Sequence, residues 1–207
     1  MLPRTKPRNL NDLAIQVSIV RPGPIVGGAV NPYIQRREKK LLTPDYEPPY
    51  AHPDLRPVLA ETLGVVIFQE QVIQVAQILA DFTAGEADKF RRTLGRKSGL
   101  AEINDYREKF LDAALKKGVT SQSAIDIFNN LLGFAQFGFP KSHGTAFALL
   151  AYQTAWLKQY YPAEFICALL NNQPMGFYPP HVLTNDAKRH GMVINRPDIN
   201  FSSISFC

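Results

Sequence analysis

The sequence predicts a mainly α-helical fold that follows an irregular N-terminal segment, and three observations support this prediction. Ten of the first 57 residues are proline, which blocks long helices there. After Arg56, apolar residues recur at steps of three and four, which is the period of an amphipathic helix. Glycine, a residue that readily ends a helix, follows these patterns at Gly95, Gly118 and Gly138.

Residues 1–57 are expected to be irregular or extended. One apolar piece within them, Leu13 to Val20, fits either a helix or a buried strand, because periodicity alone does not separate the two in so short a run. It leads into RPGPIVGG, residues 21–28, where proline fixes the backbone and glycine lets it approach another group closely.

The remaining chain is expected to form a series of helices. The first covers Phe68 to Phe82, and Thr83 with Glu86 then forms a capping box that starts a second helix, which ends at Gly95. Further helices are expected from about Leu100 to Lys117, from Ser121 to Phe137, over the apolar run Thr145 to Leu157, from Pro162 through PAEFICALLNN, and from His181 to His190.

Three segments result from this pattern. An irregular, proline-rich segment covers residues 1–57, a helical core covers 58–173, and a less regular extension covers 174–207. No internal repeat or low-complexity tract interrupts them, so a solenoid or a repeat array is not expected.

Composition indicates a globular protein with a basic surface. The 207 residues are 45% hydrophobic and 20% charged, which is ordinary for a chain that buries a core and excludes disorder along its whole length. The formal net charge is +5, and basic residues are concentrated: residues 1–40 contain eight Lys or Arg against two acids, and Lys89 to Lys97 contains five. Such clusters fit either a phosphate-binding surface or a solvated face.

Cysteine usage and the terminus point to the cytoplasm. Cys167 lies in an apolar helical pattern and Cys207 is the last residue, so neither a disulfide nor a metal site is expected. The N-terminal MLPRTKPRN lacks the apolar core of a signal peptide, and Thr145 to Leu157 is too short to span a bilayer. We therefore expect a soluble intracellular protein without a membrane partner.

A cluster of cations surrounds the end of the helix that closes at Gly95. Arg91 and Arg92 lie in its last turn, and Arg96 and Lys97 follow it. Cations near a helix C-terminus interact favourably with the helix dipole, which is the ordinary interpretation. Four cations within seven residues repel one another unless anions lie between them, however, and guanidinium groups match phosphate oxygens. A phosphate site is the second interpretation.

A second polar cluster, Lys141, Ser142 and His143, stands just before a long apolar run. Ser142 is a plausible N-cap, and the free backbone amides of a helix start favour an anion. An ammonium and an imidazole beside those amides would make a compact pocket for phosphate. A capped helix with two exposed polar neighbours remains the alternative.

Other candidate residues are weaker. Arg21 fits an ordinary loop arginine, and the two glutamines and one acid of FQEQ, residues 68–71, are expected to be solvated. His52, His181 and His190 lack metal-ligand spacing. The sequence contains no Walker loop and no Asp-x-Asp pair, so it has anion-binding groups without an evident metal site.

Several long motifs occur together in this chain: VSIVRPGP, TLGVVIFQEQVIQVAQ, FTAGEADKFRRTLGRK, FGFPKSHGTAFALLAYQTAWLKQYYPAEF and RPDIN. Their order and spacing are similar to those of the C-family bacterial DNA polymerases, which comprise the alpha subunit of DNA polymerase III and its error-prone relative. The resemblance covers nearly the whole chain, from about Leu2 to Asn200. Several motifs in register are far more specific than any single one.

The resemblance implies a multi-helix fingers domain, which binds the incoming deoxynucleoside triphosphate (dNTP) and closes over the DNA template–primer. Arg91 and Arg92 resemble the arginines that meet the triphosphate, and Lys97 resembles a further basic contact near it. Lys141, Ser142 and His143 resemble the fingers residues beside the nucleotide. The loop that holds Arg21 and Gly23 is similar to a loop near the active site.

The resemblance also implies what the chain lacks. In the family, the aspartates that bind Mg²⁺ lie in the palm, upstream of the matching region. No catalytic residue and no metal ligand is therefore expected here, and the chain is expected to be a fragment that does not polymerise DNA alone. The full-length enzyme would act in the bacterial cytoplasm with Mg²⁺ and polymerase accessory proteins.

Two features favour the error-prone branch, which serves DNA repair after damage rather than bulk DNA replication. QPMGFY, residues 173–178, is typical of that branch, and so is the proline of GFPKSH. Lys141 instead fits the replicative pattern, and RRTLGRK departs from the commoner RRAMGKK at Thr93, Leu94 and Arg96. Alternatives to the error-prone polymerase are a fragment of the replicative alpha subunit and a non-catalytic helical module that binds nucleic acid.

Overall fold

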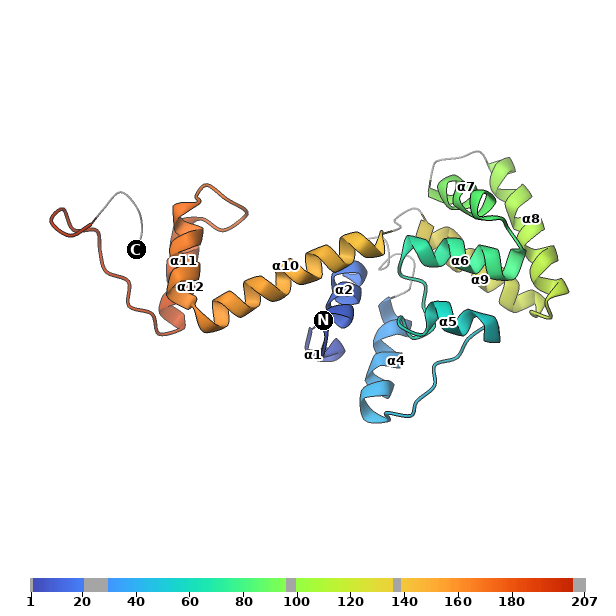
Figure 1. The fold of residues 1–207 in the computed structure, drawn as a ribbon, viewed down its shortest axis with the longest axis horizontal. Coiled ribbons are helices and arrows are strands. Elements are labelled where there is room, and N and C mark those ends of the chain that lie inside the picture. The colour runs from blue at the N-terminus through green and yellow to red at the C-terminus, as the bar shows by residue number, and fades with distance from the viewer. Residues whose placement is uncertain (1, 21–29, 96–99, 136–138, 203–207) are drawn as a thin grey trace. The chain divides into compact units, whose positions relative to one another are not determined.

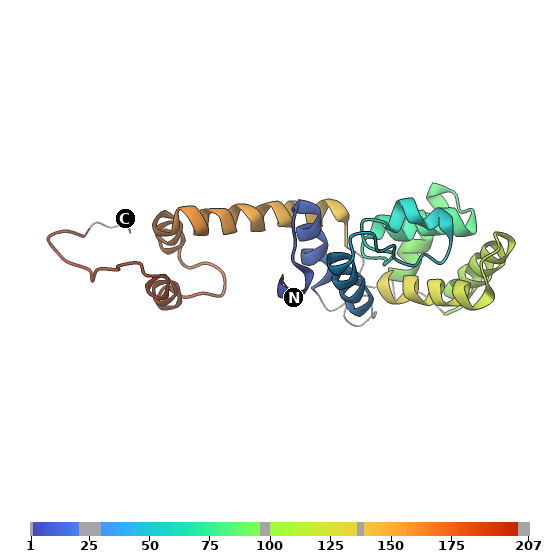
Figure 2. The same ribbon diagram turned by 90° about the horizontal axis from the view of Figure 1, so that it is seen from below.

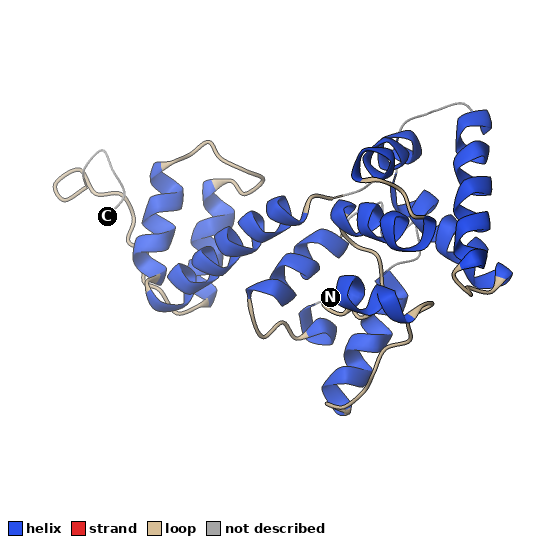
Figure 3. Cartoon of the chain, turned by 45° about the vertical axis from the view of Figure 1, so that its right-hand side comes forward, coloured by secondary structure: helices blue, strands red, loops and turns tan. Residues whose placement is uncertain are grey.

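The structure, a computed structural model, describes residues 2–20, 30–95, 100–135 and 139–202. Helices make up most of these ranges and no strand occurs in them, so the predicted mainly α fold class is confirmed (Figure 3). The chain forms two compact units, Met1–Ala148 and Leu149–Cys207. The division into segments 1–57, 58–173 and 174–207 remains a prediction.

Helices of the first unit, labelled in Figure 1, are α1 (Leu2–Thr5), α2 (Leu10–Ile19), α4 (Val30–Leu42), α5 (Arg56–Leu59), α6 (Gln69–Ala80), α7 (Ala84–Gly95), α8 (Leu100–Lys116) and α9 (Ser121–Ala135), with a 3₁₀ turn η1 (Pro53–Leu55) before α5. Helix α10 (Lys141–Tyr160) begins in the first unit and ends in the second. The second unit adds α11 (Pro162–Asn171) and α12 (Pro180–Arg189). The helices expected between Phe68 and His190 are therefore present, and Gly138 lies outside the described residues.

The first 57 residues hold more helix than the sequence analysis expected. Most prolines of this segment that the structure describes lie in a first turn, as Pro3, Pro32 and Pro57 do, or between helices. A first turn needs no backbone N–H donor, so proline is tolerated there. Leu13 to Val20 is mostly helix rather than strand, because α2 contains no proline and Asn9 caps it by accepting a hydrogen bond from the Asp12 amide at 2.9 Å.

Helices α6, α7, α8 and α9 form a bundle around one hydrophobic core, which Figures 1 and 2 show from two directions. Phe90 lies at its centre with 0% exposure, and its ring contacts four other aromatic rings at centroid distances between 5.3 and 6.4 Å. These rings belong to Phe82, Tyr106, Phe110 and Phe128. Aromatic burial of this kind stabilises the bundle and fixes the position of α7.

Polar side chains fix both ends of the bundle helices. The predicted capping box at the start of α7 is confirmed: the Glu86 carboxylate accepts from the Thr83 amide at 2.9 Å, and the Glu86 amide donates to the Thr83 hydroxyl at 3.3 Å. At the end of α6, the Lys117 ammonium donates to the Ile78 carbonyl and pairs with Asp81. Gly118 has φ +82°, as expected of a residue that ends a helix.

A buried glutamine starts α6. The Gln71 side chain is 2% exposed, and its carbonyl oxygen accepts from the amides of Ile67 at 2.8 Å and Phe68 at 3.0 Å. Its NH₂ group donates to the Thr62 hydroxyl at 2.9 Å and to the Val58 carbonyl at 3.2 Å. The expectation that the FQEQ residues are solvated is therefore wrong for Gln71, which joins the start of α6 to the chain before it.

The first turn of α10 packs closely on α2. Gly144 is buried, and a Cβ atom added to it would lie 2.5 Å from the Ser18 hydroxyl and 3.4 Å from the Ala14 carbonyl. The Ser18 hydroxyl donates to that same carbonyl at 2.6 Å, which limits its freedom to move aside. The absent side chain of Gly144 thus allows contact between the two helix backbones.

The second unit has a smaller core. Ile166 and Leu170 of α11 pack with Ala187 of α12, and Phe165 and Leu183 are among the side chains that partly cover them. An ion pair of 2.8 Å between Lys158 and Asp186 joins the end of α10 to α12. Within the described ranges, no helix combines the length and the apolar character that crossing a membrane requires.

Replacing Phe90 with alanine should destabilise the first unit by about 3–5 kcal/mol, because the substitution leaves a cavity among four rings. Urea unfolding followed by circular dichroism measures this change. Phe177→Ala is the control, because Phe177 is 97% exposed and its removal should leave the midpoint unchanged. Equal midpoints for the two variants would contradict the described core.

Gly144→Ala should cost roughly 1–3 kcal/mol in unfolding free energy, because the new methyl group overpacks the contact with α2. Gly85→Ala is the matched control: it also lies in a helix, and nothing lies within 4 Å of its added Cβ. Since alanine is the better helix former, the control should be neutral or slightly stabilising. A Gly144→Ala protein as stable as the control would rule out the close approach of α10 to α2.

Candidate functional site

The two arginines at the end of α7 share one carboxylate. Arg91 donates to Asp88 through two nitrogens, at 2.9 and 3.1 Å, and Arg92 pairs with the other Asp88 oxygen at 2.5 Å. The Arg91 side chain is 24% exposed and the Arg92 side chain 60%, so both guanidinium groups are accessible to solvent. Asp88 thus provides the anion that lets the two cations lie together.

This arrangement changes the acidity of the shared carboxyl. The pKa of Asp88 is lowered from its ordinary value of 3.8, chiefly because the Arg91 side chain donates hydrogen bonds to the ionised form, and further because of the charges of Arg91 and Arg92. Partial desolvation acts in the opposite direction and is outweighed. Asp88 is therefore ionised at neutral pH and remains a counter-ion for both arginines.

Lys141 begins α10, so the prediction that Ser142 is the N-cap is wrong. The first intrahelical hydrogen bond runs from the Gly144 amide to the Pro140 carbonyl at 3.1 Å, which makes Pro140 the capping residue. Ser142 is the second residue of the helix, and its side chain is exposed. Ser142 therefore does not occupy the capping position.

His143 is exposed between two aromatic rings. Its ring meets that of Phe139 edge-on at 4.8 Å between centroids and that of Phe147 at 4.5 Å. These contacts hold the imidazole against the first two turns of α10 while leaving it accessible.

Two carboxylates contact Lys141. Both oxygens of Glu70 lie 3.1 Å from the Lys141 amide nitrogen, and Glu61 pairs with the Lys141 ammonium at 2.6 Å. The ammonium also lies 5.9 Å from the centre of the Phe68 ring. We call the amide and the ammonium of this residue together the Lys141 corner.

The first turn of α6 connects the two basic clusters. The Gln69 side-chain oxygen accepts a hydrogen bond from Arg91 at 3.3 Å. The Gln69 backbone amide donates to the carbonyl of Phe139, two residues before Lys141, at 3.0 Å. The next residue, Glu70, accepts from the Lys141 amide. The Arg91 side chain therefore contacts Gln69 and the Lys141 amide contacts Glu70, which are consecutive residues in the first turn of α6.

Three predicted residues lie outside the described residues: Lys97, Arg21 and Gly23. Sequence reasoning also missed four residues that the structure adds to this region, Glu61, Gln69, Glu70 and Asp88. A local signal existed for Asp88, which stands three and four residues before the arginines, the spacing of helix ion pairs. None existed for Glu61, which is 80 residues from Lys141.

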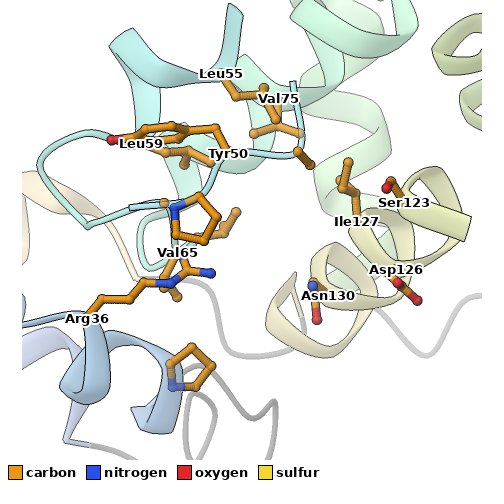
Figure 4. Close-up of a pocket in the computed structure, with 15 residues that line it drawn as sticks. Arg36, Tyr50, Leu55, Leu59, Val65, Val75, Ser123, Asp126, Ile127 and Asn130 are labelled. Atoms are coloured by element: carbon orange, nitrogen blue, oxygen red, sulfur yellow. The ribbon is translucent and has the colours of Figure 1, made fainter. Parts of the chain in front are cut away.

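A cavity lined by described residues lies elsewhere in the first unit. It has a volume of about 370 Å³ and is lined by Arg36 of α4, Tyr50, and the α9 residues Asp126 and Asn130, together with valine and leucine side chains (Figure 4). Tyr50 has a raised pKa, mainly because of burial. None of the predicted site residues lines this cavity.

The described residues contain no group of three or more His, Cys, Asp or Glu side chains that could hold a metal ion. What the arrangement offers is a set of cations and helix amides that can bind an anion.

The fold and the site define a helical domain with clustered anion-binding groups. Residues 1–118 match the family model described as the bacterial DNA polymerase III alpha subunit finger domain. The chain belongs to this family, and the predicted resemblance to the fingers of C-family polymerases is confirmed.

Three relatives illustrate the similarity. An error-prone DNA polymerase of Anaeromyxobacter dehalogenans (strain 2CP-C) is 48% identical over 202 residues, which is 98% of this chain and 17% of the relative. Proteins with the same name from Burkholderia mallei (strain ATCC 23344) and Vibrio vulnificus (strain YJ016) are 49% and 47% identical, over 94% and 98% of this chain and 18% and 19% of their own lengths. The chain spans less than a fifth of each relative.

The Asp88 carboxyl should titrate below 3.8 in a carbon-13 NMR titration. Because its pKa is lowered in the folded state, it stabilises the fold above the unfolded pKa of 3.8, and this contribution is lost as the pH falls through the folded pKa. Arg91→Gln should raise the pKa of Asp88 toward 3.8, whereas Arg107→Gln on the exposed face of α8 should not. An Asp88 pKa unaffected by Arg91→Gln would exclude the shared ion pair.

Proposed function

We propose that this chain is the fingers part of a DNA-directed DNA polymerase of the error-prone type, and that it binds the triphosphate of the incoming dNTP and the DNA template–primer. One observation carries the proposal. Arg91, which shares Asp88 with Arg92, and the backbone amide of Lys141 bond to consecutive residues in the first turn of α6, in a chain of the fingers family. The names of the relatives support the error-prone type.

The proposed chemistry assigns neutralisation to these side chains. DNA synthesis joins the 3′-hydroxyl of the primer to the α-phosphate of the dNTP and releases pyrophosphate, so negative charge accumulates on the β- and γ-phosphates. Fixed cations stabilise that charge without reorganising during the reaction. The proposed nucleotide-binding residues are Arg91, Arg92, Lys97, Lys141, Ser142 and His143, with Arg21 and Gly23 in a loop near the active site.

Each of the described residues in this set offers a suitable group. Arg92 has a largely exposed guanidinium, which can form the two parallel hydrogen bonds that phosphate oxygens accept. Ser142 has an exposed hydroxyl in the first turn of α10, and His143 has an accessible imidazole. Together they supply positive charge and hydrogen-bond donors.

The remaining parts of the reaction are proposed to lie outside this chain. The carboxylates that hold Mg²⁺ would belong to the rest of a longer polypeptide, which is consistent with relatives more than five times as long. The isolated chain would then bind nucleotide without polymerising it. The complete enzyme would act in the bacterial cytoplasm, with accessory proteins, in the repair of damaged DNA.

The test is nucleotide binding by the 207-residue chain, measured by calorimetry with dATP. We expect Arg91→Ala with Arg92→Ala to weaken binding by roughly 1–3 kcal/mol for each charged contact that is lost. Arg107→Ala is the control, since it removes one cation from an exposed position of α8 outside the cluster.

The outcomes separate the proposal from its alternatives. Equal loss of affinity in the control would indicate a general effect of charge. A chain that binds single-stranded DNA but no dATP at millimolar concentration would favour the non-catalytic nucleic-acid-binding module. A fragment of the replicative alpha subunit would also bind dATP, and is disfavoured by the names of the relatives.

A further inference from the structure

Carboxylates of the chain itself occupy the anion-binding positions of the Lys141 corner. The Glu70 carboxylate lies with both oxygens 3.1 Å from the first backbone amide of α10. An amide at the start of a helix of 20 residues carries the positive end of the helix dipole, which is where an anion is most stabilised. Glu70 takes the place that a phosphate oxygen would take there.

The Glu61 carboxylate occupies the corresponding position at the Lys141 ammonium. One oxygen of Glu61 lies 2.6 Å from the Lys141 ammonium and also accepts a hydrogen bond from Asn11 at 3.3 Å. The Lys141 side chain is 40% exposed and the Glu61 side chain 26%, so both remain in contact with solvent. An ion pair of this exposure is weak enough to exchange partners.

A triphosphate cannot simply be added to this arrangement. Its charges would meet the two carboxylates that contact Lys141, those of Glu61 and Glu70, and like charges at short range repel. The single N–H of the Lys141 amide is already bonded to Glu70, so a phosphate oxygen would have to replace that carboxylate there, and at the ammonium it would lie beside Glu61.

We propose that Glu61 and Glu70 are stand-ins for phosphate oxygens that hold Lys141 in position in the free chain, leave when nucleotide binds, and thereby set the affinity for nucleotide. The inference rests on the proposed function and adds two positioning residues to it. Holding the ammonium and the helix start in place before binding would reduce the ordering that a nucleotide has to impose, and the repulsion would limit how tightly it binds.

Glutamine substitutions separate this role from a purely structural one. Glu70→Gln and Glu61→Gln keep an oxygen that accepts a hydrogen bond from Lys141, so the amide and the ammonium keep their partners while the competing charge is removed. Glu108→Gln is the matched control, because it changes the net charge equally on an exposed position of α8.

The experiment compares binding of dATP and of inorganic tripolyphosphate by the wild-type chain, both single variants, the double variant and the control, with a thermal melt of each. We expect each single variant to bind both probes roughly threefold tighter and the double variant roughly tenfold tighter, with melting temperatures near that of the wild type. The control should equal the wild type.

Unchanged or weaker binding by the double variant, in a chain that otherwise binds dATP, would overturn this inference and leave the proposed function intact. Weaker binding together with a lowered melting temperature would assign the two glutamates to structure alone. If all five proteins fail to bind either probe, the proposed function fails, and the inference fails with it. Tighter binding in the control as well would show that net charge, rather than the Lys141 corner, governs affinity.

Discussion

The first turn of α6 is the constraint on which the candidate site depends. Three consecutive residues of this turn contact three different parts of the first unit. Gln71 turns inward and satisfies buried amides and a hydroxyl, Glu70 meets the start of α10, and Gln69 accepts a hydrogen bond from Arg91. Because Gln71 is buried and fully engaged, the two residues before it have little freedom, and both basic clusters take their positions from them.

Electrostatic balance accompanies this geometry. Cations that would repel one another lie close together because each has a carboxylate of the same chain beside it: Asp88 between Arg91 and Arg92, and Glu61 at Lys141. Exposed ion pairs of this kind contribute little to the stability of a fold. Their main effect is to hold each basic side chain beside a carboxylate, Arg91 and Arg92 at Asp88 and Lys141 at Glu61.

Local patterns in the sequence predicted the helices well and the contacts between them poorly. Helix α7 begins after Thr83, which forms a capping box with Glu86, and ends at Gly95, as expected. Capping depends on residues only a few positions apart, which is why the sequence predicts it. Most prolines of the N-terminal segment misled the prediction, because a proline in a first turn does not prevent the helix that follows. The partners of Lys141 were invisible in the sequence, since Glu70 and Glu61 are 71 and 80 residues away and only the packing of α10 brings them near.

The absence of a side chain at Gly144 makes the position of Lys141 depend on α2. At Gly144, three residues after Lys141, helix α10 packs against α2 at Ala14 and Ser18. Residues of α2, near the start of the chain, therefore support the helix turn that carries Lys141. In a family member with larger or smaller side chains at these positions of α2, the first turn of α10 would shift. The Lys141 ammonium would then move although no charged residue had changed.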